Sequence, residues 1–193
     1  EADIIIKTSG VGAFDEFLEK EIPDLKHKDN AVIFWDVDAP ATLERIGANE
    51  ADPFRKLIPE YDLILTYGGG DPVVNSYKSF GAVECIPVYN ALDPETHFPV
   101  EKELSYAVDL AFLGNRLPDR EQRVHHYFGE VAASLPHMQF LLGGSGWESN
   151  NFTSNVMLKG HIPTEKHNAF NSSPMALLNI CRDSMARFGF SPA

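Results

Sequence analysis

The sequence has few basic residues, few cysteines and no long apolar run, and each shortage removes a class of protein. Lys and Arg number 16 against 28 Asp and Glu, a formal charge of −12. Because nucleic-acid binding requires a basic face, we expect no nucleic acid as a partner. No apolar run reaches the roughly 18 residues of a membrane-spanning helix, so no transmembrane segment is expected. The two cysteines, Cys85 and Cys181, lie in apolar runs, which indicates buried thiols in a reducing, cytoplasmic compartment.

The chain is rich in short apolar runs that alternate with helical stretches. Its 193 residues, 44% of them hydrophobic, suffice for one sizeable core or two small ones. Residues Phe14, Phe17 and Leu18 mark the apolar face of one predicted helix. The alternation predicts an α/β protein with doubly wound parallel sheets, whose strands are covered on both faces. The predicted strands are residues 3–8, 31–37, 62–66, 83–88, 108–113, 137–142, 155–158 and 176–180.

A stretch with two prolines and no clear period, residues 90–106, separates two α/β regions of similar size. We therefore predict two Rossmann-like domains, residues 1–97 and 98–193, with a cleft between them. The first region holds 8 basic and 19 acidic side chains, and the second 8 and 9, so the second is the better host for an anionic ligand. The chain has no initiator Met and begins almost directly in a strand, so we expect a fragment of a longer protein with both domains incomplete.

Ligands of parallel α/β sheets bind beyond the carboxyl ends of the strands, which directs attention to the residues that follow each run. The turn 143–147, with three glycines and a serine, is a candidate phosphate site or an ordinary turn. Arg116 is placed to pair with a diphosphate, or else is a surface arginine paired with Asp119 or Glu121. In the first region the candidates are Ser9, Gly10, Tyr67 and Gly69; in the second they are Gly114, Asn115, Arg116, Gly143, Gly144, Ser145, Gly160, His161 and Arg182.

Acidic residues follow two strands of the first region. Asp36 and Asp38 form an Asp-x-Asp triplet, but Asp38 also suits the cap of a following helix, so no metal site is predicted there. Asp71, followed by proline, is predicted to be the N-cap of a helix, which disfavours phosphate at the preceding glycines and leaves a hydroxyl-rich ligand possible there. The histidines show no zinc-ligand spacing.

Several strings of the sequence resemble the CgeB-type family of glycosyltransferase-like proteins, which is named for a spore maturation protein. The most specific lie in the second region: Phe112-Leu-Gly-Asn-Arg-Leu-Pro-Asp-Arg-Glu-Gln-Arg-Val124, Gly160-His-Ile-Pro-Thr-Glu-Lys-His-Asn168 and Leu178-Asn-Ile-Cys-Arg-Asp-Ser-Met-Ala186. Trp35-Asp-Val-Asp-Ala-Pro40 and Tyr61-Asp-Leu-Ile-Leu-Thr-Tyr-Gly-Gly-Gly70 extend the likeness over almost the whole chain. The family's opening strand and glycine loop, and the helix whose glutamate holds the donor ribose, are not found in these residues.

The resemblance implies the two-domain GT-B architecture and a transferase that uses a nucleotide-activated sugar as co-substrate, with no bound cofactor or metal. The second domain would bind the donor, with phosphates near Gly114 to Arg116 and the base near Gly160, and the first would bind an unknown glycan, protein or small-molecule acceptor. Asp71 and Asp38 are the candidate general bases. Two alternatives stay open: a degenerate module that binds a sugar nucleotide or glycan without turnover, and an unrelated two-lobed sugar receptor.

Overall fold

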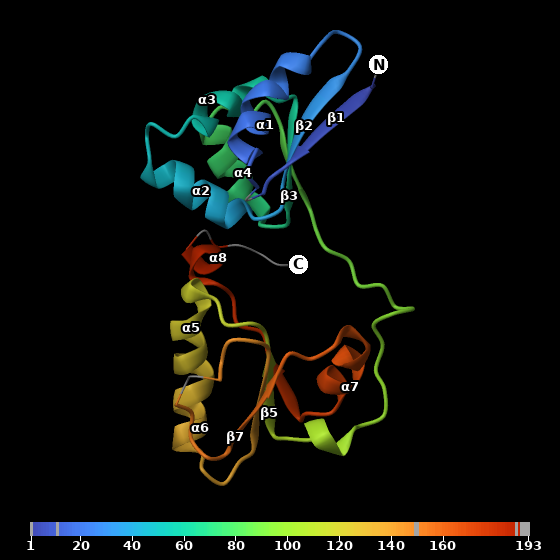
Figure 1. Cartoon of the computed structure of the whole chain (residues 1–193), viewed down its shortest axis with the longest axis vertical. Helices are drawn as coiled ribbons and strands as arrows, with labels where there is room; N and C mark the ends of the chain where they lie inside the picture. Colours follow the sequence, from blue (N-terminus) through green and yellow to red (C-terminus); the bar gives the residue numbers. More distant parts are fainter. Residues whose placement is uncertain (1, 11, 149–150, 188, 190–193) are drawn as a thin grey trace. The chain divides into compact units, whose positions relative to one another are not determined.

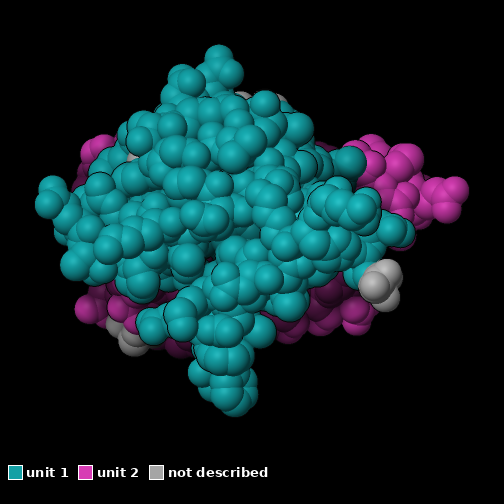
Figure 2. All heavy atoms as spheres, turned by 90° about the horizontal axis from the view of Figure 1, so that it is seen from above, with its two compact units in different colours: residues 1–91, 184–193 teal, residues 92–183 magenta. Residues whose placement is uncertain are grey.

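The computed structural model describes residues 2–10, 12–148, 151–187 and 189, and it divides into two compact units (Figures 1 and 2). Unit 1 comprises residues 1–91 with 184–193, and unit 2 comprises residues 92–183. Each unit is built on one four-stranded parallel sheet. This confirms the predicted α/β class with two Rossmann-like parallel sheets. The domain boundary expected near residue 97 stays a prediction.

All eight predicted strands are present, each within a few residues of its expected ends. Unit 1 runs β1 (Ile4–Thr8), α1 (Asp15–Glu21), β2 (Ala31–Asp36), α2 (Ala39–Ala48), α3 (Phe54–Leu57), β3 (Leu63–Tyr67), α4 (Gly70–Ser79) and β4 (Cys85–Val88). Unit 2 runs β5 (Leu110–Leu113), α5 (Pro118–Val124), α6 (Glu130–Ser134), β6 (Phe140–Gly143), β7 (Val156–Gly160), α7 (His167–Ser172) and β8 (Ala176–Leu178). A π-helix, η4 (His125–Gly129), joins α5 to α6, and α8 (Asp183–Arg187) begins at the end of unit 2.

In unit 1 the strands follow one another across the sheet in chain order, β1-β2-β3-β4. Because right-handed crossovers in one direction place every connecting helix on the same side, α1, α2, α3 and α4 all lie over one face of the sheet (Figure 1). The core fills the space between that face and the helices. Its largest fully buried side chains are Phe34, Leu43, Ile46, Phe54, Ile58, Tyr61, Ile64 and Tyr77.

Among the described residues, no helix of unit 1 lies over the other face of its sheet, which corrects the expectation that these strands are covered on both faces. Ile6 in β1 and Ile86 in β4 are each 46% exposed on this side, and Ile4 is 59% exposed. The strand register pairs Ile33 with Ile6 and Leu65 with Ile86, so Ile33 and Leu65 lie on the same face of the sheet. The apolar runs therefore identified the strands correctly. Within unit 1 taken by itself, however, the apolar side chains on one face of the sheet are not covered.

Unit 2 has the sheet order β7-β6-β5-β8, with β6 buried along its whole length. The helices α5 and α6 lie on one side of the sheet and α7 on the other (Figure 1). Two separate clusters result. One joins Phe112, Val124, Phe128, Phe140, Leu142 and Trp147, and the other joins Tyr106, Ala111, Leu141, Ile162 and Phe170. Cover on both faces is thus confirmed for the central strands β5 and β6, whereas the edge strands β7 and β8 keep exposed residues, among them Met157 and Leu177 at 44% each.

Both cysteines are free thiols. Cys85 is buried in β4, and burial raises the pKa of its thiol to about 12. Cys181 is partly exposed. In the described part of the chain no helix is long and apolar enough to cross a bilayer.

Candidate functional site

The order of strands in unit 2 places a topological switch point between β5 and β8. From β5 the chain moves to β6 and β7 on one side, and it then returns to β8 on the other side of β5. The loops beyond the carboxyl ends of β5 and β8 therefore diverge, and such a crevice is where open α/β sheets bind ligands. The predicted donor residues Gly114, Asn115 and Arg116 follow β5, and Arg182 follows β8.

The glycine turns after β5 and β6 are joined by backbone hydrogen bonds. Gly114 N–H donates to the carbonyl of Gly143 (2.9 Å), and Arg116 N–H donates to that of Ser145 (2.9 Å). Ser145 N–H in turn donates to Oδ1 of Asn115 (2.9 Å). The structure thus brings these five predicted residues together.

Two further hydrogen bonds complete the joint between the turns after β5 and β6. Gly144 N–H donates to the carbonyl of Gly160 at the end of β7 (2.6 Å), and the buried indole N–H of Trp147 donates to the carbonyl of Gly114 (2.8 Å). Trp147 was not among the predicted site residues. The amides of Gly114, Gly144 and Ser145 consequently already have protein acceptors and are not available to bind an anion.

Two of the predicted arginines have acidic partners. The guanidinium of Arg116 is 2.8 Å from the carboxylate of Glu121, the surface pairing that the sequence left open. Nε of Arg182 donates to Oδ2 of Asp119 at 2.6 Å, which ties the loop after β8 to the start of α5. His161, beyond β7, is exposed. The role of these residues in donor binding stays a prediction.

Arg120 is a third arginine at this end of the sheet, and the sequence analysis missed it. It lies in the first turn of α5, and its Nη1 is 2.8 Å from the position that a Cβ on Gly114 would occupy. Its Nε is enclosed and has no hydrogen-bond partner among the described residues. Burial, and next the nearby charge of Arg182, lower the pKa of Arg120. Asp119 pairs with Arg182, but two guanidinium groups, one of them partly desolvated, outnumber this one carboxylate, which favours an anion between the loops after β5 and β8.

The candidate acceptor residues of unit 1 are only partly brought together. A pocket of about 310 Å³ opens where β1 and β2 end and α2 begins. It contains three of the predicted residues, and its lining is Ser9, Gly10, Val37, Asp38, Ala41, Thr42 and Arg45. Tyr67 ends β3, and Gly69 and Asp71 follow it; none of the three is in that lining. Asp38, one of the two candidate bases, therefore faces this pocket.

Asp71 is not the N-cap that the sequence predicted. The helix α4 begins at Gly70, its N-cap position is Gly69, and Asp71 is the second helical residue and exposed. Gly68, Gly69 and Gly70 have φ of 70°, 99° and 61°, so three successive residues have a positive φ, and the last of them is the first residue of α4. This glycine run moved the start of the helix toward the strand, because only glycine adopts such backbone angles at little cost. Asp38, by contrast, does occupy the N-cap position of α2.

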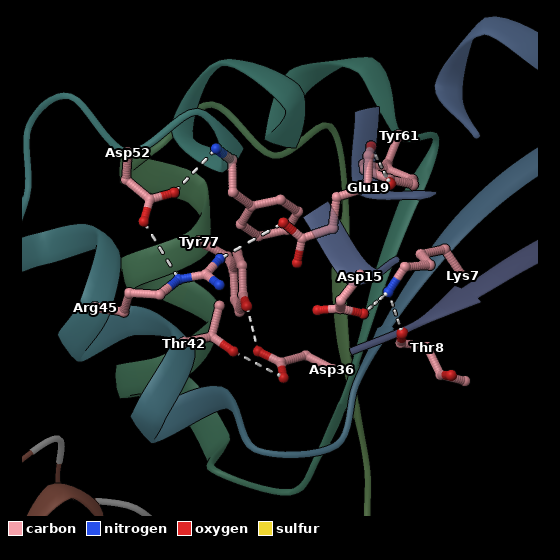
Figure 3. A network of polar contacts seen from close by, with 11 residues as sticks. Lys7, Thr8, Asp15, Glu19, Asp36, Thr42, Arg45, Asp52, Tyr61 and Tyr77 are labelled. Atoms are coloured by element: carbon pink, nitrogen blue, oxygen red, sulfur yellow. Dashed lines mark hydrogen bonds and ion pairs between the residues drawn. The ribbon is translucent and has the colours of Figure 1, made fainter. Parts of the chain in front are cut away.

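Beneath this pocket, Asp36 is fully buried and holds the start of α2 in place (Figure 3). Its Oδ1 accepts hydrogen bonds from Asp38 N–H (3.0 Å) and the Thr42 hydroxyl (3.1 Å), and its Oδ2 accepts one from the Tyr77 hydroxyl. Burial raises the pKa of Asp36, and these hydrogen bonds oppose the shift in part. Because the carboxyl is enclosed, it positions Asp38 and Thr42 rather than meeting a ligand.

The raised pKa of Asp36 makes the stability of unit 1 depend on pH in a defined direction. The folded state holds the proton more tightly than the unfolded chain, so the stability that this group contributes is present at acid pH and is lost as pH rises through its folded pKa. We expect Asp36→Asn, which does not ionise, to flatten this fall. The measurement is urea unfolding of both proteins over a series of pH values. Parallel curves for the two would contradict the shift.

A second polar network lies between α1, α2 and α3 (Figure 3). The buried Nζ of Lys7 contacts Asp15 at 2.5 Å. Arg45 lies 3.7 Å from the buried carboxylate of Glu19 and 3.3 Å from Asp52. Burial is the main cause that raises the pKa of Glu19. Since Arg45 also lines the pocket, its charge there is largely balanced by these two acids.

No group of three or more His, Cys, Asp or Glu side chains placed to hold a metal occurs among residues 2–10, 12–148, 151–187 and 189. The Asp36 and Asp38 pair has no third oxygen ligand of that kind.

Comparison with known proteins gives a likeness of fold and no family. No family model matches the chain, and no curated protein matches it. Among solved structures, Alr3699/HepE of Anabaena in complex with UDP-glucose is similar at 10% sequence identity and a TM-score of 0.47. The match covers 70% of this chain and 43% of that one, so the chain corresponds to less than half of that protein. These comparisons do not confirm membership of the CgeB-type family, which stays a resemblance of sequence strings.

Proposed function

We propose that this chain belongs to a glycosyltransferase that takes a sugar from a nucleotide-sugar donor, with the donor diphosphate bound by unit 2 and the acceptor by unit 1. The observation that carries the proposal is the pair Arg120 and Arg182 at the switch point of the unit 2 sheet. The enclosed Nε of Arg120 has no hydrogen-bond partner among the described residues, and burial, followed by the charge of Arg182, lowers the pKa of Arg120. A diphosphate held by the terminal guanidinium nitrogens of this pair would balance the positive charge that Asp119, the partner of Arg182, leaves over.

The backbone around this pair supports the proposal. The hydrogen bonds between the turns after β5 and β6 fix the loop that carries Arg116 and the start of α5 that carries Arg120. A side-chain site on a fixed backbone binds with little loss of conformational freedom. Residues 112–124 and 178–186, which resemble the CgeB-type strings, contain the loops after β5 and β8, so the resemblance points to the same two loops for donor binding. In the reaction the departing diphosphate would gain negative charge, which these guanidinium groups stabilise.

For the acceptor we propose the pocket beside Asp38. The carboxylate of Asp38 would accept the proton of an acceptor hydroxyl while that oxygen bonds to the anomeric carbon of the sugar. Ser9 and Thr42, which also line the pocket, offer hydroxyl groups for orienting a polar acceptor. The anionic balance of residues 1–97, with 19 acidic against 8 basic side chains, favours a neutral or cationic acceptor.

Nucleotide binding tests the donor site directly. Thermal melting and isothermal titration with UDP, GDP, dTDP, CDP and their common sugar conjugates should identify one nucleotide class that stabilises the chain. At roughly a hundredfold excess over its dissociation constant, a specific ligand adds about 2.7 kcal/mol to stability. We expect Arg120→Ala to weaken that nucleotide about 10- to 100-fold, because it removes hydrogen bonds from a charged donor. Arg116→Ala should weaken it less, since Arg116 is exposed and paired with Glu121.

The matched control is Lys102→Ala, which removes one positive charge from an exposed side chain of unit 2 in the segment that leads into β5. Its affinity should equal that of the unchanged protein. If no nucleotide of the panel bound to the folded chain, the donor site would be contradicted. Equal losses of nucleotide affinity in Arg120→Ala and in the control Lys102→Ala would contradict its placement. Binding without transfer of labelled sugar would instead favour the degenerate binding module.

A further inference from the structure

The strand β1 is an open edge of the unit 1 sheet. In the described part of the chain it pairs only with β2, so the backbone groups on its other side lack a strand partner. Exposed edges of this kind are usually guarded by proline or by outward-pointing charge. This strand has neither: it contains no proline, and Lys7, its one charged residue, is 6% exposed and turned inward to Asp15.

The helix that follows presents its apolar side outward. In α1 the polar side faces the core, where Asp15 meets Lys7 and the buried Glu19 lies near Arg45. The apolar residues of this segment are consequently exposed, Phe14 by 71%, Phe17 by 59% and Leu18 by 40%. The apolar face that these three residues were predicted to mark is thus exposed within unit 1. Large exposed apolar patches of this kind mark interaction surfaces.

A groove connects the open edge to this helix. It has a volume of about 390 Å³ and runs along β1, with Ile6 on the strand side and Leu18 and Ile22 on the helix side. The open face of the sheet continues the apolar surface through Ile4 and Ile6, which are 59% and 46% exposed. The groove also contains Lys7 and Asp15, which are paired with each other. A strand that pairs with this edge meets Leu18 and Ile22 on one of its faces and borders the open face of the sheet on the other, so apolar residues suit it at successive positions.

We propose that the occupant is β1 of a second copy of this chain, paired antiparallel with the first across a two-fold axis. Its residues Ile4, Ile5 and Ile6 are successive apolar side chains on an open edge, which is the kind of strand that suits the groove. An isologous contact of this type joins the two sheets into one continuous sheet of eight strands. The same axis sets the two α1 helices antiparallel, with Phe14 and Phe17 at their contact.

The charges of α1 agree with a symmetric pair. Glu16 and Lys20 are both exposed and lie one helical turn apart, so in antiparallel helices Glu16 of each copy faces toward Lys20 of the other. Electrostatic repulsion between the two copies opposes association, because each chain carries a net charge of −12. We therefore expect the pairing to strengthen as salt screens that repulsion.

The test is the molar mass of the 193-residue chain in solution, measured by light scattering over a roughly hundredfold range of concentration at low and at moderate salt. We expect a monomer–dimer equilibrium that shifts toward dimer with concentration and with salt. Ile6→Lys and, separately, Phe17→Glu should each leave only monomer. The control Ile86→Lys introduces the same charge at a residue of the opposite edge strand with the same 46% exposure, and it should still dimerise.

Hydrogen exchange of the β1 amides provides a second measurement that does not depend on the variants. In the dimer, the β1 amides that point away from β2 should be protected, and protection should rise with protein concentration. A monomer at every concentration with rapid exchange of these amides would overturn the proposal and leave the groove to a strand from another polypeptide. A dimer that survives both Ile6→Lys and Phe17→Glu would overturn it as well.

Discussion

Replacing Asp36 with alanine is expected to destabilise unit 1 by about 3–5 kcal/mol, because it leaves several buried hydrogen-bond donors without an acceptor at once. The Tyr77 and Thr42 hydroxyls and the amide of Asp38 all donate to this one carboxylate. Tyr77 is itself fully buried, so its hydroxyl has no access to water when the acceptor is removed. Each unsatisfied donor costs about 1–3 kcal/mol, and partial collapse of the site recovers some of that cost.

Urea unfolding followed by amide NMR signals measures this effect, because signals from the two units can be read separately. The loss should appear in unit 1, while the midpoint of the unit 2 signals stays unchanged. Asp71→Ala is the matched control, since it removes an exposed carboxylate from the first turn of α4 in the same unit. It should change stability by no more than about 0.5 kcal/mol. Equal effects of the two substitutions would show that the buried hydrogen bonds do not hold this end of the sheet.

The strands of this chain were predictable because their signal is local. Runs such as residues 31–37 and 137–142 are apolar and rich in β-forming residues, and each became a strand at nearly that place. Cover on both faces was not a local property. It depended on the direction in which successive crossovers ran, and the sequence of a strand does not encode that direction. The same run pattern therefore gave a sheet with helices on both sides in unit 2 and on one side in unit 1 (Figure 1).

The helix α1 shows what periodicity leaves open. Phe14, Phe17 and Leu18 form the apolar face that their spacing predicts, but α1 turns its acidic side inward. The reason lies outside the helix: the buried Lys7 on β1 and the more exposed Arg45 on α2 supply positive charges, which Asp15 and Glu19 approach. A charged residue in the middle of an apolar strand was the available signal, since a buried lysine requires an acidic partner.

The candidate site was predictable to the level of its loops and not of its side chains. The rule that ligands bind beyond the carboxyl ends of parallel strands led to the turns after β5 and β6, and the structure joins those turns. Arg120 was missed as a site residue because it lies within a helix, six residues after Gly114, and its side chain reaches back over that glycine. The absence of a side chain at Gly114 makes the room for it. Such a contact becomes visible only when the helix has been placed against the strand.

Substituting alanine for Gly144 is expected to have the largest effect on unit 2, at more than about 4 kcal/mol. An added Cβ would lie 2.2 Å from the carbonyl oxygen of Gly114 and 2.9 Å from the amide of Asn115, and both are backbone atoms that cannot rotate away. The residue also has a φ of 126°, which L side chains rarely adopt. The joint between the turns after β5 and β6 would have to separate, with the loss of the hydrogen bonds that cross it.

Gly160→Ala is the control that separates backbone strain from steric conflict. Gly160 also has a positive φ, 61°, but its nearest neighbour would be a carboxylate oxygen of Glu148 at 3.9 Å, so space is available. We expect it to cost about 1–2 kcal/mol, the penalty of a left-handed conformation alone. Urea unfolding of the unit 2 amide signals measures both. A cost for Gly144→Ala no larger than that for Gly160→Ala would mean that the turns after β5 and β6 separate easily, and a site built on their fixed geometry would then lose its physical basis.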